Sequence, residues 1–360
     1  MNFQSLIDFF GLREPGKPIA YGWARIAIYL FLLALPFGHN AAVKNIAMLV
    51  MAFSAIWLIR CRLLEIDWRS PIFHGLAVLL LVLMITAGLG IDSGDSFVEL
   101  RKHFLPGVLM FLLIPTVFRG EPAIRRLLVV AALAFAIRAG LTVLELAYYF
   151  PDVNAGRSDG NFIKGFSLDA GFYIPILLGL LLLQARWRWL TVCCLLATLA
   201  VMLLVQSRAP VAAAIVAVVA MLFLLRKWRL LSASLLIVST AAIYVGITHP
   251  DIAQRFSLAV SPQTYIQAID TRNYKQGDGF SGRTPIWYGL IEITAPRPWT
   301  GYGFGWKKLG PIAVSDGFVA RWQAQAEDSF ATEKAKYFSQ QASTVNPHNL
   351  YLQIYFESGL

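Results

Sequence analysis

The chain has 360 residues, of which 57% are hydrophobic and only 14% are charged. Soluble globular proteins carry about a quarter charged residues, so this composition excludes an ordinary soluble domain and is typical of a protein that crosses a membrane many times. The formal net charge of +10 does not indicate nucleic acid binding, because the basic residues lie in short clusters between apolar runs, as membrane topology requires.

The chain begins with apolar residues at helical spacing, namely Phe3, Leu6, Ile7 and Phe10. This spacing favours a short interfacial helix, and a disordered tail fits the same residues. The first long apolar run follows and carries Arg25 near its start. Because the run is about as long as a bilayer span, we interpret it as a retained membrane anchor and not as a cleaved signal peptide.

Nine apolar runs along the chain each approach the ~20 residues that a membrane span needs. They cover residues 20–37, 42–59, 71–91, 103–118, 126–150, 168–184, 189–206, 209–225 and 230–248. The sequence therefore predicts an all-α polytopic membrane protein.

The Lys and Arg residues of the short connections predict the orientation of these spans. One set of connections holds thirteen of them: Arg13, Lys17, Arg60, Arg62, Arg69, Arg119, Arg125, Arg126, Arg186, Arg188, Arg226, Lys227 and Arg229. The other set holds five: Arg101, Lys102, Arg157, Lys164 and Arg208. The positive-inside rule places the first set, and the N-terminus with it, in the cytoplasm. Nine spans then bring the chain to the outer face.

A long segment, residues 249–347, follows on that outer face. It is nearly charge-balanced and rich in Trp, Tyr and Phe, which favours a folded subdomain over a solvated tether. Thr284 and Pro285 predict the cap and first residue of a helix that runs to about Ala295. The stretch Gly301–Trp306 predicts a loop that needs a flexible backbone.

We expect three parts: a bundle of nine helices with an N-terminal interfacial segment over residues 1–248, a periplasmic loop subdomain over 249–347, and the start of a tenth span over 348–360. A run as short as the last part cannot cross a bilayer. We therefore expect about ten spans in this chain and about twelve in a complete one.

The segment that joins the loop to this last run predicts a reactive histidine. Asn346 is a good helix N-cap and Pro347 suits the first helical position, so His348 is expected in the first turn of a helix. The helix dipole there disfavours protonation, and a neutral imidazole can accept a proton. The alternative is a solvated residue at a helix end.

Two arginines are expected at the same membrane face. Arg208 follows Ser207 at a tight outer turn between two apolar runs, where it can bind phosphate or extend to lipid headgroups. Arg283 precedes a helix N-terminus, a place that suits anions, although an ordinary surface arginine fits equally. Two arginines and one base at one lipid–water level suit transfer of a group from a lipid-linked diphosphate.

Other polar residues carry weaker signals. Arg138 and Glu145 lie seven residues apart in one apolar run, where a structural ion pair is expected. The cysteines indicate no disulfide framework, and the five histidines are scattered without metal-ligand spacing.

Two further residues flank the outer start of the sixth run. Lys164 and Asp169 could line a cavity for the donor. Asp169 could equally pair with Arg208 or Arg157.

Several short motifs resemble, in their order along the chain, those of the O-antigen ligase/polymerase family of bacterial membrane proteins. They are Ser207-Arg208, Gly282-Arg283 with Trp287, Gly301-x-Gly303-x-Gly305, and His348-Asn349-x-Tyr351-Leu352 followed by Glu357-x-Gly359. They cover the second half of the chain, whereas the first half matches only in helix number and topology.

The resemblance implies a metal-independent glycosyltransferase without a cofactor, in the bacterial inner membrane with its active site facing the periplasm. It would move a glycan from undecaprenyl diphosphate, with inversion, to a sugar hydroxyl of lipid A–core. Membrane lipids are further partners and nucleic acid is not. His348 resembles the base, and Arg208 and Arg283 resemble the diphosphate-binding arginines. The expected secondary site residues are Ser207, Lys164, Asp169, Asn349 and Tyr351.

Members of this family differ in their acceptor, so an O-antigen polymerase and a protein O-oligosaccharyltransferase stay alternatives. We favour the ligase because the outer segment is compact and carries no added soluble domain. A transporter or flippase of lipid-linked sugars is the rival from another class. It should show symmetry-related halves with broken helices, which the sequence does not indicate.

Overall fold

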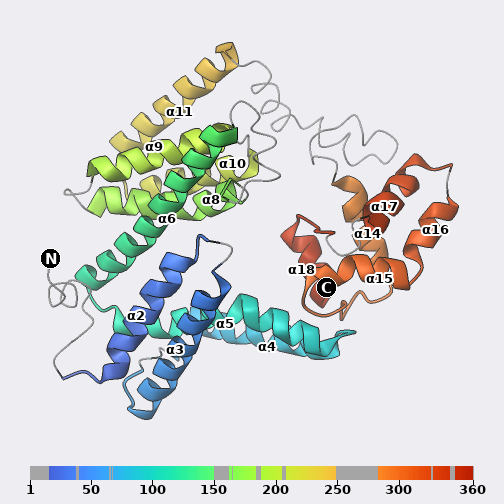
Figure 1. Cartoon of the computed structure of the whole chain (residues 1–360), viewed down its shortest axis with the longest axis horizontal. Coiled ribbons are helices and arrows are strands. Elements are labelled where there is room, and N and C mark those ends of the chain that lie inside the picture. Colours follow the sequence, from blue (N-terminus) through green and yellow to red (C-terminus); the bar gives the residue numbers. More distant parts are fainter. Residues whose placement is uncertain are drawn as a thin grey trace. The chain divides into compact units, whose positions relative to one another are not determined.

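A computed structural model gives the fold of the chain (Figure 1). The structure describes residues 16–37, 40–64, 66, 68–149, 162–163, 165–183, 188–204, 208–248, 283–325, 327–340 and 345–359. Within these ranges the chain forms helices, turns and loops but no strand. It divides into two compact units, Met1–Ile66 with Val108–Ala253, and Asp67–Gly107 with Gln254–Leu360. The predicted N-terminal interfacial helix lies outside the described residues.

Each apolar run predicted to span the membrane is a helix. The helices are α2 (Ile19–Ala34), α3 (Ala41–Arg60), α4 (Pro71–Leu89), α5 (Ser93–Val117), α6 (Glu121–Tyr149), α8 (Phe166–Leu183), α9 (Arg188–Leu204), α10 (Arg208–Leu224) and α11 (Trp228–Thr248). Of the described helices, α3, α4 and α6 are long and apolar enough to cross a membrane, and α2 and α8–α11 contain shorter apolar stretches. A helix satisfies its own backbone groups in lipid, so these elements fit a multi-pass membrane protein. The count of ten spans stays a prediction.

Close helix packing builds the first unit. α2 packs on α3 and α6, and α8 packs on α6, α9 and α10 (Figure 1). On α2, the buried side chains of Ala20, Ala24 and Ala27 let the neighbouring backbones approach closely. Between α6 and α8, the rings of Phe135 and Tyr173 stack with centroids 4.6 Å apart.

A buried arginine joins the first predicted span to the fourth. Arg25 is 3% exposed, and its Nε donates to the carbonyl of Val117 at 2.6 Å. The hydroxyl of Tyr21 donates to the carbonyl of Thr116 at 2.5 Å. The last carbonyls of a helix have no partner inside the helix and carry partial negative charge. The end of α5 therefore stabilises this cation.

The second unit contains α4 and the first part of α5 together with the outer segment. Its further elements are α14 (Thr284–Thr294), η2 (Trp306–Lys308), α15 (Leu309–Ser315), α16 (Phe318–Ala324), α17 (Ser329–Gln340) and α18 (Leu350–Ser358). The predicted helix after residue 283 is confirmed, but it starts one residue early. Arg283 is the N-cap, Thr284 is the first helical residue, and Pro285 lies in the first turn, where it needs no donor.

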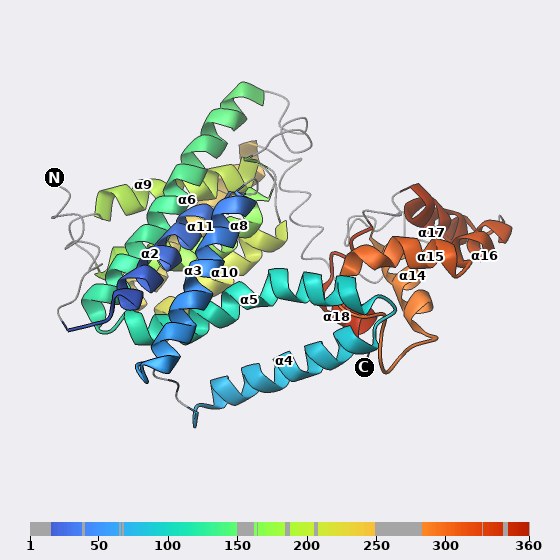
Figure 2. The same ribbon diagram turned by 60° about the horizontal axis from the view of Figure 1, so that its bottom comes forward.

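Aromatic side chains of the outer segment form one hydrophobic core. Leu290, Tyr302, Trp322, Phe338 and Phe356 are all buried in it. They come from α14, the glycine loop, α16, α17 and α18, of which α14–α17 are seen together in Figure 2. The aromatic residues thus hold the short helices together. The predicted domain boundaries at residues 248 and 347 depend on where the chain leaves and enters the membrane, and they stay a prediction.

Candidate active site

His348 lies in a short non-helical segment directly before α18. Its φ of +50° is in the left-handed region, which is uncommon for a residue other than glycine. The oxygen of the Asn346 side chain accepts a hydrogen bond from the His348 N–H at 2.7 Å and so closes a local turn. A non-glycine residue in this conformation costs on the order of 1–3 kcal/mol of folding stability, and such residues cluster at functional sites.

The predicted start of this helix is wrong by three residues. Asn349, not Asn346, is the N-cap, because its side chain accepts from the N–H groups of Tyr351 at 3.0 Å and Leu352 at 3.2 Å. An N-cap oxygen satisfies these second and third helical donors. His348 consequently lies outside the helix, where its backbone can adopt the left-handed conformation.

A residue in the first turn of α14 makes a hydrogen bond to Pro347, the residue before His348. The Trp287 Nε1–H donates to the carbonyl of Pro347 at 2.7 Å. Arg283 lies four residues before Trp287, which puts both side chains on the same face of the helix start. The charge of Arg283 acts on His348. Two of the three principal predicted site residues therefore lie close together, although they are 65 positions apart in the sequence.

Two features of its surroundings, burial and a nearby charge, favour the neutral form of the His348 imidazole. Partial burial, and then the positive charge of Arg283, lower the pKa of His348 below its ordinary value of 6.5. The direction of this shift agrees with the expected neutral imidazole, but its causes are burial and a neighbouring charge, whereas the helix dipole was expected. Burial also lowers the pKa of Arg283, but a guanidinium stays charged at any relevant pH. The residue His348 as a whole is exposed, so a substrate can reach it.

The glycine motif forms a loop that lies against the other end of α18. Gly301, Gly303 and Gly305 have φ values of +60°, +89° and +113°, which favour glycine. The predicted loop is therefore confirmed, and its left-handed backbone at all three glycines is a further finding. The N–H of Tyr302 donates to the carbonyl of Phe356 at 2.8 Å, so the loop contacts the helix that begins after His348.

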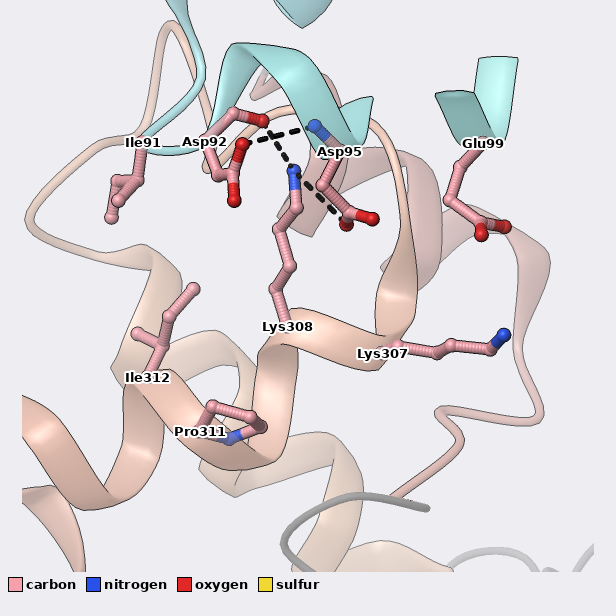
Figure 3. A pocket seen from close by; sticks show the side chains of 8 residues that line it. All are labelled: Ile91, Asp92, Asp95, Glu99, Lys307, Lys308, Pro311 and Ile312. Atoms are coloured by element: carbon pink, nitrogen blue, oxygen red, sulfur yellow. Dashed lines mark hydrogen bonds and ion pairs between the residues drawn. The ribbon is translucent and has the colours of Figure 1, made fainter. Parts of the chain in front are cut away.

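A pocket of about 390 Å³ lies beside this loop (Figure 3). Its charged lining comes from the start of α5 and from η2, and its apolar lining from Ile91 and α15; the residues are Ile91, Asp92, Asp95, Glu99, Lys307, Lys308, Pro311 and Ile312. Lys308 Nζ donates to the carbonyl of Asp92 at 3.0 Å and lies 3.9 Å from an Asp95 carboxylate oxygen. Burial lowers the pKa of Lys308, and the charges of Asp95, Asp92, Glu357 and Glu99 oppose this shift.

Comparison with known proteins finds similarity to O-antigen ligases. A family model described as O-antigen ligase matches residues 192–360. The O-antigen ligase of Salmonella typhimurium strain LT2 is 24% identical over 357 residues, which cover 97% of this chain and 80% of the Salmonella protein. Over its second half, the chain matches the O-antigen ligase family. No solved structure matches it.

Similarity to the O-antigen ligase family supports a role in glycosyl transfer. The matched range contains Arg208, Arg283 and His348, whereas Lys164 and Asp169 precede it. The family match thus covers the three residues on which the predicted chemistry depends.

Four other predicted site residues belong to the first unit, namely Arg208, Ser207, Lys164 and Asp169, whereas Asn349 and Tyr351 lie at the start of α18 in the second unit. Arg208 is the first residue of α10, and its side chain is not among those that the structure describes. Ser207 and Lys164 lie outside the described residues. The gathering of Arg208 with Arg283 and His348 stays a prediction.

Asp169 belongs to a charged cluster that the sequence did not indicate. Its charge acts on Arg138 and on Lys44. Lys44 Nζ also donates to the carbonyl of Phe37 at 2.8 Å. Pairing of Asp169 with Arg157, a residue outside the described ranges, or with Arg208 stays untested.

The predicted interaction between Arg138 and Glu145 is one part of a larger arrangement. The charge of Glu145 acts on Arg138. One Glu145 oxygen also accepts from the N–H groups of Phe162 and Ile163, both at 2.6 Å. The Arg138 guanidinium lies 5.3 Å from the centroid of the Phe162 ring. Glu145 therefore binds the backbone that precedes α8 as well as balancing a buried cation.

Proposed function

We propose that this protein is an O-antigen ligase of the bacterial inner membrane, with a cytoplasmic N-terminus and an active site facing the periplasm. It transfers a glycan from undecaprenyl diphosphate to a sugar hydroxyl of lipid A–core. The observation that carries this proposal is the exposed His348 directly before α18, whose pKa is lowered by partial burial and then by the charge of Arg283. Similarity to the O-antigen ligase family supports the same chemistry.

In the proposed reaction His348 acts as the general base. Its imidazole takes the proton of the acceptor hydroxyl, and the hydroxyl oxygen forms a bond to the anomeric carbon of the donor. The bond from that carbon to the diphosphate breaks, and the electron pair leaves with the diphosphate. A single displacement of this kind inverts the anomeric carbon.

In this scheme Arg283 and Arg208 stabilise the charge that develops on the leaving diphosphate. Arginine suits this role because its planar group binds phosphate oxygens in pairs. Before the donor binds, partial burial and then the charge of Arg283 lower the pKa of His348 and so favour the neutral imidazole. Once bound, the diphosphate offsets that charge, so the imidazole becomes more basic when it is needed. The proposed reaction needs no metal, because the arginines supply the positive charge.

Two members of the same family and one protein of another class are the alternatives. An O-antigen polymerase would use a second lipid-linked glycan as acceptor, and a protein O-oligosaccharyltransferase would use a Ser or Thr. The ligase is favoured by the Salmonella relative, which is an O-antigen ligase that aligns with 97% of this chain. A transporter of lipid-linked sugars would move the donor without breaking its diphosphate bond.

Purified protein reconstituted with the lipid-linked donor and lipid A–core tests the proposal. Wild-type protein should form the joined product, and His348→Ala should insert normally but form none. The control is His74→Ala, which changes another exposed histidine, whose Nδ1 lies 3.0 Å from the Ser70 carbonyl. Wild-type turnover in His348→Ala would remove the base from the proposal.

The same reconstitution separates the alternatives. Products longer in repeat units without lipid A–core indicate a polymerase, and donor movement without cleavage indicates a transporter. Full activity after extensive chelation supports the metal-free reaction. Loss that Mg²⁺ restores would contradict it.

A further inference from the structure

The short helix α18 is attached to the rest of its unit at both ends. At its start, Trp287 donates to the carbonyl of Pro347, the residue before His348. At its end, the glycine loop bonds to the last turn: Tyr302 N–H donates to Phe356 at 2.8 Å, and Gly303 N–H donates to the Glu357 carbonyl at 3.0 Å. The helix thus connects the histidine segment to the glycine loop.

The Glu357 side chain adds a second bond between the helix and this loop. The residue is 4% exposed, and its Oε1 accepts from the Gly305 N–H at 3.1 Å. The same oxygen accepts from Gln353 Nε2 at 2.9 Å. Backbone and side chain of Glu357 therefore contact two successive glycines of the motif, and Gln353 orients the carboxylate.

The opposite side of the loop lies against the turn between α4 and α5. The N–H of Ile91 donates to the carbonyl of Tyr302 at 3.3 Å. A Cβ on Gly303 would lie 2.8 Å from Gly90 Cα, so backbone meets backbone here. Lys308 extends from η2 and donates to the Asp92 carbonyl (Figure 3). It also donates to Ser96 Oγ. The loop is thereby fixed, and α18 is fixed through the loop.

We infer that Glu357 is a positioning residue for the transfer reaction: through the Gly305 N–H its carboxylate fixes α18 to the glycine loop, and this sets the place of His348. The inference rests on the proposed function of His348 as base. Glu357 itself lies at the far end of the helix and takes no proton from the substrate.

Helix geometry shows why a bond at one end matters at the other. A helix of nine residues is about 13 Å long and moves as a rigid body. A tilt that starts at the Glu357 end displaces the turn at the other end, where contacts hold His348 in its left-handed backbone. Among the described residues, Arg283 at the start of α14 is the charged group that acts on His348. Displacement therefore separates the imidazole from Arg283 and from the surroundings that bury it.

The test compares Glu357→Ala, Glu357→Gln and a control, Ser358→Ala, in the reconstituted ligase assay over a range of pH. Among the described residues, the Ser358 hydroxyl bonds within its own helix alone, to the Ile354 carbonyl at 2.8 Å. Misplacement of a reacting group by about 1 Å can cost on the order of 100-fold. Glu357→Ala should therefore lower kcat by about 10- to 100-fold with little change in donor KM. The acid limb of the pH profile, where activity falls because His348 becomes protonated, should also move to higher pH in Glu357→Ala. The reason is that His348 loses the burial and the Arg283 charge that lower its pKa.

Glu357→Gln should restore kcat and the pH profile, because an amide oxygen can accept both hydrogen bonds. Ser358→Ala should match wild type. A variant that is merely less stable gives less active protein, but its acid limb does not move. An unmoved limb in Glu357→Ala, or a Gln variant as impaired as the Ala variant, would overturn the inference.

Two further measurements keep the result decisive. If Glu357→Ala does not fold, Gln353→Ala replaces it. This variant removes the Gln353 hydrogen bond that orients the Glu357 carboxylate and leaves the carboxylate in place. A shift of the acid limb in Gln353→Ala supports the positioning role of Glu357, and an unchanged pH profile refutes it. His348→Ala is measured alongside. Wild-type turnover in His348→Ala defeats the proposed function, and the inference with it. An inactive His348→Ala beside an unshifted Glu357→Ala defeats the inference alone.

Discussion

Replacement of Gly303 by alanine tests how tightly the glycine loop is packed. A Cβ at this position would lie 2.6 Å from Ser96 Oγ and 2.8 Å from Gly90 Cα. Contacts this short force the surroundings to move, and backbone moves less readily than a hydroxyl. The residue also has a φ of +89°, which an L-amino acid disfavours.

The structure provides a control that separates these two costs. Gly317 has a similar φ of +74°, but nothing lies within 4 Å of a Cβ built there. Gly317→Ala should therefore cost only the left-handed backbone, about 1–2 kcal/mol. Gly303→Ala should add overpacking of about 1–3 kcal/mol, for a total of about 2–5 kcal/mol.

The assay is the free energy of unfolding of each purified variant in detergent micelles, with glycan transfer measured on the folded fraction. Ser96→Ala in the Gly303→Ala background should recover only part of the loss, because the contact with Gly90 Cα remains. Equal destabilisation of Gly303→Ala and Gly317→Ala would refute the claim that the loop is closely packed at Gly303.

Two further predictions concern Arg283 and His348. Arg283→Lys should lower kcat/KM by about 10- to 150-fold, as expected for loss of a charge-assisted hydrogen bond of about 1.5–3 kcal/mol. Steady-state kinetics with the lipid-linked donor measure this change. Unchanged kinetics would exclude Arg283 from phosphate binding. Activity should fall as the pH drops through the lowered pKa of His348, that is below 6.5, and stay level above it. Arg283→Gln removes a charge that lowers this pKa, so the acid limb of kcat/KM should move upward, and a downward shift would contradict the assigned electrostatics.

Hydropathy predicted the apolar helices because the apolar run that indicates each helix lies within that helix. Every apolar run became a helix with ends within a few residues of those expected, except that α5 begins about ten residues before its apolar run, at Ser93. The extra turns carry polar residues such as Asp95 and Glu99, which pack beside η2. An apolar-run criterion cannot detect helix that is stabilised by such long-range contacts.

The histidine segment shows the limit of local signals at the site. Asn346 before Pro347 is a strong start signal for a helix, yet Asn349 provides the cap. The choice depends on Trp287, whose indole holds the Pro347 carbonyl from 60 positions away. A contact between such distant residues cannot be deduced from spacing. The proximity of Arg283 and His348 was nevertheless predicted, because both precede helices on the same predicted membrane face.

The bond between Arg25 and the Val117 carbonyl has a consequence for biosynthesis. The two residues are 92 positions apart, so the guanidinium emerges from the ribosome well before its acceptor. A bare cation within the hydrocarbon is costly. Until Val117 has been synthesised, this carbonyl cannot accept from Arg25. The contact between α2 and the end of α5 is therefore one that forms late in synthesis of the amino-terminal helices.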